Sequence, residues 1–286
     1  MYMYWNGEIV SPEEAKISPF DHGYLYGMGV FETFRVYKRH PFLFDDHYER
    51  LKKGFKQLNI RNAPSKEELL KGLNQLLEHN KIEDAYVRLN VSAGVGEIGL
   101  RTEPYEMPTV IMYMKHLPFD TVYAEKEAQL LNLRRNTPEG LVRLKSHHYL
   151  NNMLAKREIG HRPNVEGIFL TEKDMLAEGI VSNLFWVKEG TVYTPSVDTG
   201  ILNGITRLFI LEMCHKLQIP VKEGHFKKEA LLFADEAFVT NSIQEIVPLK
   251  KVMEQWMPKE KPVISMLKMY YDKNRKQLWT RHEFQK

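Results

Sequence analysis

Cysteine is nearly absent from this sequence: Cys214 is the only one in 286 residues. That count excludes an internal disulfide and a cysteine-based metal cluster. No apolar run approaches the roughly 18 residues of a membrane-spanning helix, and the first residues lack the basic and apolar regions of a signal peptide. Lysine and arginine total 40 against 37 acidic residues, which leaves no large basic surplus for nucleic acid. We therefore expect a cytoplasmic globular protein with no membrane or nucleic-acid partner.

The residues that are present suit a sizeable folded core. Hydrophobic residues make up 43% of the chain and aromatic residues 11%, which is enough for one or two domains. Strand-like and helix-like patterns alternate without repeats. In the first part they predict a hairpin around Asn6-Gly7, a helix that begins with a capping box from Ser65 to Glu68, a helix over residues 45–58, and strands over residues 30–37, 85–93 and 108–115.

The second part of the chain is richer in strands. Its patterns predict a hairpin turn at Lys188-Glu189-Gly190, helices over residues 149–159, 207–217 and 263–274, and strands over residues 129–134, 167–171, 180–187, 191–194 and 236–240. The segment around Pro118 is the best candidate for a linker. We therefore predict an α+β protein with an N-terminal lobe over residues 1–115, a linker over residues 116–122 and a C-terminal lobe over residues 123–286.

Lys145 and Glu178 are the two residues with the clearest chemical meaning. Lys145 lies in a predicted loop, and Glu178 is predicted to open a strand. A lysine amine condenses with an aldehyde, and a carboxylate can keep a pyridine nitrogen protonated; these are the protein groups that pyridoxal 5'-phosphate (PLP) chemistry needs most. Most lysines are surface charges, so the pair indicates PLP only together with the sequence around it. The adjacent His147 and His148 lack a metal-binding pattern, and we predict no metal site.

Three further places could bind an anion such as phosphate. The stretch Asn203-Gly204-Ile205-Thr206 precedes a predicted helix, whose free N–H groups would suit a phosphate, although the same residues could simply cap the helix. Arg50 projects away from the apolar face of the 45–58 helix, toward a cleft or toward solvent. Ser242 follows a predicted strand, where its hydroxyl can reach an anion or form a turn.

The longest recognisable patterns are Glu178-Gly-Ile-Val-Ser-Asn-Leu-Phe185, Tyr193-Thr-Pro195, Gly200-Ile-Leu202 and Gly204-Ile-Thr-Arg207. Together with residues 18–27 and 235–242, they resemble the class IV aminotransferase family over roughly residues 3–250. This is the fold-type IV group of PLP enzymes, which includes branched-chain aminotransferases, D-amino-acid aminotransferases and 4-amino-4-deoxychorismate lyases. The resemblance implies a two-lobed fold with a smaller α/β N-terminal lobe, a larger C-terminal lobe built on a pseudobarrel, PLP between the lobes, and a homodimer.

Carried over residue by residue, the resemblance assigns cofactor-binding roles to seven positions. Lys145 would hold PLP covalently, and Glu178 would pair with the pyridine nitrogen. Contacts to the cofactor phosphate are implied for Arg50, Ile205, Thr206 and Ser242. Tyr149 would lie near the ring oxygen, although a shift of one residue separates it from the tyrosine of the branched-chain enzymes.

Within the family, the block from Arg134 to Asn152 looks most like the aminodeoxychorismate lyases, and Thr33 matches a threonine of those lyases. This implies conversion of the small molecule 4-amino-4-deoxychorismate to 4-aminobenzoate and pyruvate, a step toward folate. In that reaction Lys145 would move a proton from the substrate, and the Thr33 hydroxyl would relay or position a proton for the departing pyruvate. A purely structural role for Thr33 in its strand is the alternative.

The sequence also permits other interpretations of single residues and of the function. Arg35, Arg88 and Arg101 are candidates for binding substrate carboxylates, and each could equally be a surface or structural charge. The first alternative function is a class IV aminotransferase that acts on D-amino acids or branched-chain substrates. The second is a non-catalytic PLP-binding protein, which would not need a carboxylate such as Glu178 to strengthen the cofactor as an electron sink.

Overall fold

The computed structural model describes residues 1–285, which form two compact units. Unit 1 consists of residues 1–121, 144–148 and 276–280. Unit 2 consists of the remaining described residues, 122–143, 149–275 and 281–285. Residues 144–148 and 276–280 thus belong to unit 1, whereas the sequence-based division places them in the C-terminal lobe.

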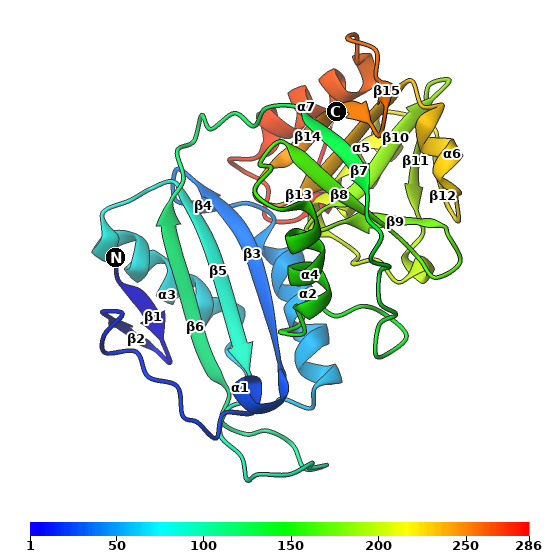
Figure 1. Ribbon diagram of the computed structural model, residues 1–286. Helices are drawn as coiled ribbons and strands as arrows, with labels where there is room; N and C mark the ends of the chain where they lie inside the picture. The colour runs from blue at the N-terminus through cyan, green and yellow to red at the C-terminus, as the bar shows by residue number, and fades with distance from the viewer. Residues whose placement is uncertain (286) are drawn as a thin grey trace. The chain divides into compact units, whose positions relative to one another are not determined.

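Unit 1 is built on a six-stranded antiparallel sheet in the order β2-β1-β6-β5-β3-β4 (Figure 1). Its strands are β1 (Met3–Trp5), β2 (Glu8–Val10), β3 (Gly29–Tyr37), β4 (His40–Pro41), β5 (Ala85–Ser92) and β6 (Thr109–His116). Its helices are α1 (His22–Tyr26), α2 (Phe44–Gln57) and α3 (Lys66–Asn80). The predicted hairpin is confirmed, since Asn6 and Gly7 join β1 to β2 with φ values of 45° and 102°.

One face of this sheet is packed against α2 and α3, and the other is not. Val30 and Phe34 of β3 share a buried core with Leu51 of α2 and Leu73 of α3. Because side chains alternate along a strand, Phe31 and the other odd-numbered residues of β3 lie on the opposite face. The capping box that starts α3 is confirmed: its serine hydroxyl accepts from a backbone N–H at 3.2 Å, and its glutamate accepts in return at 2.7 Å.

Unit 2 contains a nine-stranded mixed sheet whose main path runs β12-β11-β10-β13-β14-β7-β8-β9, with β15 paired to β14. The strands are β7 (Lys126–Leu130), β8 (Val165–Leu170), β9 (Leu176–Gly179), β10 (Asn183–Lys188), β11 (Thr191–Pro195), β12 (Val221–Gly224), β13 (Glu236–Asn241), β14 (Glu245–Val252) and β15 (Gln255–Trp256). The sheet curls so that β9, at one end of the path, returns beside β10 and β11. This curl is the pseudobarrel that the resemblance implies.

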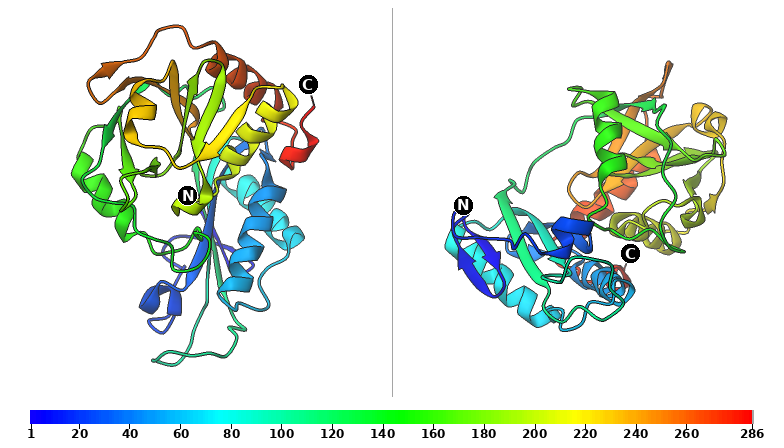
Figure 2. Two further views of the ribbon diagram at one scale, coloured as in Figure 1. Left: turned by 90° about the vertical axis from the view of Figure 1, so that its right-hand side faces the viewer. Right: turned by 60° about the horizontal axis from the view of Figure 1, so that its bottom comes forward.

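Helices cover parts of the unit 2 sheet. They are α4 (Leu150–Ile159), α5 (Ile205–Lys216), α6 (Lys228–Leu232) and α7 (Pro262–Asn274), with short 3-10 turns η1 (Val197–Thr199) and η2 (Arg281–Glu283). Both α5 and α7 pack against β13, and α4 packs against β8 (Figure 2). The α+β class is therefore confirmed. Within residues 1–285, no helix combines the length and apolar character needed to cross a membrane.

The strand predicted over residues 180–187 is wrong at its beginning. Glu178 lies at the end of β9 rather than at the start of a strand, and a turn separates it from β10. The Gly179 N–H donates to the Ser182 carbonyl at 2.8 Å and closes this turn. A β carbon on Gly179 would lie 2.1 Å from the Ser182 hydroxyl oxygen, so the turn has room only for glycine.

Candidate active site

The segment that carries Lys145 is attached to the edge of β3. The Phe31 N–H donates to the Lys145 carbonyl at 2.9 Å, and the His147 N–H donates to the Gly29 carbonyl at 3.0 Å. Val30 and Ser146 form an antiparallel bridge between these two bonds. Backbone pairing therefore fixes the main chain at Lys145, in contrast to a lysine in an unattached loop.

Lys145 lies on the face of the unit 1 sheet opposite α2 and α3 with three other side chains, and together they are called the Lys145 face: Phe31, Thr33, Arg88 and Lys145. The Lys145 Nζ lies 4.5 Å from the centroid of the Phe31 ring, and the Arg88 guanidinium carbon lies 3.7 Å from the same centroid. Thr33 is the cross-strand partner of Arg88. It therefore projects from the same face as Arg88. The structure thus places Lys145, Thr33 and Arg88 on one face of the sheet.

The His147 ring packs on the same face, 6.4 Å from the centroid of the Phe31 ring. A β carbon on Gly29 would lie 2.4 Å from the Cε1 atom of His147, so the imidazole rests directly on the backbone of β3. Burial, with a contribution from the Arg88 charge, lowers the pKa of His147 to about 4. The ring is therefore neutral at physiological pH. Its Nε2 atom is buried and has no hydrogen-bond partner within the described residues.

Arg50 is held by a buried carboxylate. Its Nε and Nη2 atoms donate to the two oxygens of Glu32 at 2.7 and 2.6 Å, and His47 Nδ1 lies 2.7 Å from Glu32 Oε2. His47 and Arg50 are three residues apart on α2, which places both on one side of the helix. Burial alone would raise the pKa of Glu32, but the neighbouring Arg50 and His47 outweigh it and lower the pKa to about 2.

The other two candidate arginines donate to backbone carbonyls. Arg35 is buried and donates to the carbonyls of Pro118 and Phe119 at 2.8 and 3.4 Å. Arg101 donates to the Pro104 carbonyl at 3.0 Å and stacks over the Tyr105 ring at 4.9 Å. Arg35 projects from the same face of β3 as Phe31, but its guanidinium is bonded to the carbonyls of Pro118 and Phe119. Arg88 lies over the Phe31 ring, as Lys145 does, so we carry Arg88 forward as the candidate for a substrate carboxylate.

Glu178, in unit 2, is buried and fixed on both of its oxygens. Arg135 Nε donates to Oε1 at 2.8 Å, while the Leu202 N–H donates to Oε2 at 3.0 Å. Arg143 Nε lies 4.0 Å from Oε1, and burial, with a contribution from Arg135, lowers the pKa of Arg143 to about 10. Arg135 and the Leu202 N–H therefore hold this carboxylate in one orientation, and Arg143 adds a second positive charge nearby.

Residues 204–206 and 240–242 form a second group in unit 2, called the α5 cradle. Gly204 precedes α5 and supplies no capping side chain, so the N–H groups of Ile205 and Thr206 are left for another acceptor. The hydroxyl oxygens of Thr206 and Ser242 are 3.4 Å apart. The Thr240 hydroxyl is buried without a partner within residues 1–285.

These donors fit the phosphate of PLP. A helix N-terminus with unused N–H groups attracts an anion through its donors and its dipole. The Thr206 and Ser242 hydroxyls supply further donors there, and Thr240, two residues before Ser242, carries another hydroxyl without a partner within residues 1–285. Leu202, whose N–H holds Glu178, is three residues before Ile205, so one short segment connects the carboxylate to the α5 cradle. Tyr149, the remaining cofactor candidate, immediately precedes α4.

Several supporting residues are missing from the sequence-based prediction. Glu32 and His47 hold Arg50, and Arg135 holds Glu178. Only the position of Glu32 beside Thr33 in the strand could have drawn attention to the first pair, because a carboxylate in a strand otherwise rich in apolar residues needs a buried partner. Nothing in the local sequence connects Arg135 to a carboxylate on a different strand.

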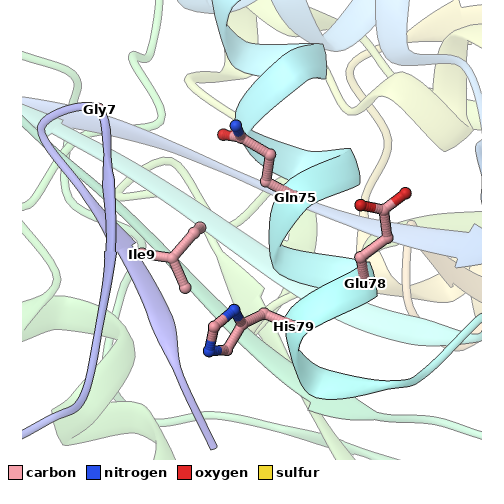
Figure 3. Close-up of a pocket in the computed structure, with 5 residues that line it drawn as sticks. All are labelled: Gly7, Ile9, Gln75, Glu78 and His79. Carbon is pink, nitrogen blue, oxygen red and sulfur yellow. The ribbon is translucent and has the colours of Figure 1, made fainter.

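A hollow elsewhere on unit 1 contains none of the predicted site residues. It has a volume of about 430 Å³ and lies where the β1–β2 hairpin meets α3 (Figure 3). Its lining consists of Gly7, Ile9, Gln75, Glu78 and His79. His79 also packs edge-on against the Tyr2 ring at 4.3 Å. We assign it no part in the chemistry.

Comparison with known proteins agrees with these features. The model of the family amino-transferase class IV matches residues 29–252. The aminodeoxychorismate lyase of Bacillus subtilis is 53% identical over 254 residues, which cover 88% of this chain and 87% of that protein. The D-alanine aminotransferase of Staphylococcus aureus is 32% identical over 252 residues, which cover 87% and 88% respectively.

A solved structure extends the agreement to the fold and the cofactor. The branched-chain amino acid aminotransferase of T.th. with pyridoxamine 5'-phosphate is 25% identical and superposes with a TM-score of 0.84, covering 97% of this chain and 96% of that chain. The fold-type IV architecture and the PLP dependence expected from the sequence are thereby confirmed. The chain belongs to the class IV aminotransferase family of PLP-dependent enzymes.

Proposed function

We propose that this protein is an aminodeoxychorismate lyase, which converts 4-amino-4-deoxychorismate to 4-aminobenzoate and pyruvate in folate biosynthesis. The observation that carries the proposal is the 53% identity to a lyase over 88% of the chain. The Lys145 face supports it, because a hydroxyl and an arginine project from the same side of the sheet as the lysine. Elimination of a carboxylate-bearing fragment needs a proton donor, and a cation suits the carboxylate.

The chain's own groups have separate roles in this proposal. Lys145 holds the cofactor and takes the proton from the substrate carbon that bears nitrogen. Thr33 positions the proton that the departing pyruvate receives, and Arg88 binds a substrate carboxylate. When bound, PLP supplies an electron sink for the negative charge that develops on the substrate.

Other residues hold the cofactor. Glu178 pairs with the pyridine nitrogen, and the charge of Arg135 fixes the orientation of that carboxylate. The phosphate is bound through Arg50 and through the α5 cradle, by Ile205, Thr206 and Ser242. Tyr149 is assigned to the ring oxygen. These roles rest on the fixed geometry of Glu178 and on the unused donors of the α5 cradle.

A class IV aminotransferase is the second candidate, since relatives of this kind share the fold and the cofactor. The two activities differ in a way that one assay separates. Aromatisation drives the lyase reaction, so it needs no keto-acid acceptor, whereas transamination does. Purified protein should release 4-aminobenzoate, measured by its fluorescence, from enzymatically made aminodeoxychorismate without added keto acid. Brisk transamination of D-alanine or leucine with no lyase activity would overturn the substrate assignment.

The cofactor attachment has its own test. Borohydride reduction of the purified yellow protein should fix PLP to the single peptide that contains Lys145, identified by mass spectrometry. A label on another lysine would contradict the assignment. We also propose that the protein is a cytoplasmic homodimer, as is usual for this fold, and light scattering of the purified protein tests the dimer.

A further inference from the structure

A buried polar network in unit 2 connects strands that carry no predicted site residue. Lys126, at the start of β7, donates from Nζ to Glu166 Oε2 on β8 at 2.7 Å and to Gln244 Oε1 at 3.0 Å. The Ser182 hydroxyl donates to the other oxygen, Glu166 Oε1, at 2.7 Å. The Lys126 and Glu166 side chains are only 11% and 5% exposed. The network is therefore shielded from solvent and its carboxylate has a partner on each oxygen.

One end of the network holds the turn that follows Glu178. Ser182 closes this turn through the bond from the Gly179 N–H. A β carbon on Gly179 would lie 2.1 Å from the Ser182 hydroxyl oxygen and 2.6 Å from Glu166 Oε1. The backbone directly after Glu178 is thus pressed against the network, and a change in Glu166 or Ser182 would be transmitted to it.

The other end holds the turn that contains Ser242. Asn241 Oδ1 accepts from the N–H groups of Ile243 and Gln244 at 2.9 and 2.7 Å, which closes the turn between β13 and β14. Gln244 then accepts from Lys126, so the turn is tied to β7. The Ser242 hydroxyl, within this turn, faces Thr206 at 3.4 Å.

Stability alone does not explain why an ion pair such as Lys126 and Glu166 is buried here. Removing a lysine and a carboxylate from water costs several kcal/mol for each ion, and well-packed apolar residues of similar volume are often as stabilising or more so. What a fully satisfied polar network supplies is a single geometry. The geometry that this network determines is the separation between the turn after Glu178 and the turn at Ser242.

We propose that Lys126 and Glu166 are positioning residues that match the two ends of the PLP site in unit 2 to the length of the cofactor. They act through Ser182 on the backbone next to Glu178, and through Gln244 on the turn that presents Ser242. The inference rests on the proposed cofactor roles of Glu178 and Ser242.

The test replaces the ion pair by apolar residues of similar size, in the double variant Lys126→Met/Glu166→Leu. A matched control is Lys250→Met, which removes a partly exposed ion pair between β14 and β7, Lys250 with Glu127 at 3.3 Å. Each purified protein is titrated with PLP after the cofactor has been stripped. The phosphorus NMR resonance of the bound phosphate, the absorption maximum of the bound cofactor and the urea midpoint of the stripped protein are also measured.

The urea midpoint of the double variant should stay close to that of the wild type. Its affinity for PLP should fall about tenfold or more. Effects of this size are seen in metalloproteins when residues that hydrogen-bond to the metal ligands are replaced. Its phosphorus resonance should also shift. The control should match the wild type in every measurement. Wild-type PLP affinity and an unmoved phosphorus resonance in the double variant would overturn the proposal and leave the network a purely structural role.

Two single changes decide the matter if the double variant does not fold. Ser182→Ala should move the absorption maximum more than the phosphorus resonance, because it releases the Glu178 end. Gln244→Met should do the reverse, because it releases the Ser242 end. Equal or absent effects in the two variants would also overturn the proposal. Every readout is PLP binding and not turnover, so wild-type protein that binds PLP without lyase activity would contradict the substrate assignment alone.

Discussion

Replacing Glu32 by glutamine should destabilise unit 1 strongly, because the carboxylate is buried and charged. At 1.36 kcal/mol per pKa unit, the lowering of the Glu32 pKa from 4.5 to about 2 corresponds to about 3 kcal/mol of unfolding free energy at neutral pH. Glutamine preserves the shape and one acceptor but removes the charge that Arg50 and His47 contact. The variant should therefore lose up to about 3 kcal/mol, measured by urea unfolding of the stripped protein at pH 7.5.

A stricter test is how the difference in unfolding free energy between wild type and Glu32→Gln depends on pH. The folded-state pKa of Glu32 is below its ordinary value, so its contribution is complete above about pH 4.5 and is lost as the pH falls toward 2. The gap between wild type and Glu32→Gln should therefore be present at pH 7.5 and should narrow as the pH falls below 4.5.

A control separates this effect from the general loss of an ion pair. Glu106→Gln removes an exposed pair with Arg61, at 3.7 Å, and should cost less than about 1 kcal/mol. A Glu32→Gln protein as stable as the wild type at pH 7.5 would refute the reasoning. So would a gap that stays unchanged down to the lowest pH at which the wild type remains folded.

The remaining predictions concern the cofactor and the substrate. Glu178→Ala should still bind PLP while turnover falls by orders of magnitude, whereas Arg50→Ala should lose PLP on dialysis; the opposite pattern would exchange their roles. Thr33→Val should fold and bind PLP but lose about 10²–10⁴-fold in lyase kcat, and a wild-type rate would remove Thr33 from the reaction. Arg88→Leu should raise KM for aminodeoxychorismate more than it lowers kcat. An unchanged KM would mean that Arg88 does not bind the substrate carboxylate.

Much of the fold can be predicted where a single element is long and its pattern is regular. The helix predicted over residues 45–58 and the strands predicted over residues 30–37 and 85–93 lie within one or two residues of the ends of α2, β3 and β5. The sequence pattern does not predict β14, because Pro248 interrupts an otherwise apolar run and proline is depleted in strands. It fits there because the parallel pairing of β14 with β7 begins at Leu249, one residue later.

From the sequence, only individual candidate residues of the site can be predicted, and not the contacts that hold them in place. Characteristic local sequence marks Lys145 and Glu178 as candidates, and the family resemblance adds Arg50. The residues that hold them in place come from other elements, and only the tertiary fold brings Arg135 to Glu178, or α2 to the buried Glu32. No local pattern contains this information, since the partners are separated along the chain and pair through side chains alone.

The residues that set the reaction apart from transamination must include groups other than those that hold the cofactor. Lyase and aminotransferase relatives share one fold and one cofactor, so the lysine, the carboxylate and the phosphate donors cannot by themselves choose between the two activities. In unit 1, backbone pairing with β3 fixes the main chain at Lys145. Thr33 and Arg88 lie on the same face and are free to differ among relatives without disturbing that pairing. If the substrate assignment is correct, replacing both Thr33 and Arg88 by other residues should change which reaction is catalysed, while PLP binding is retained.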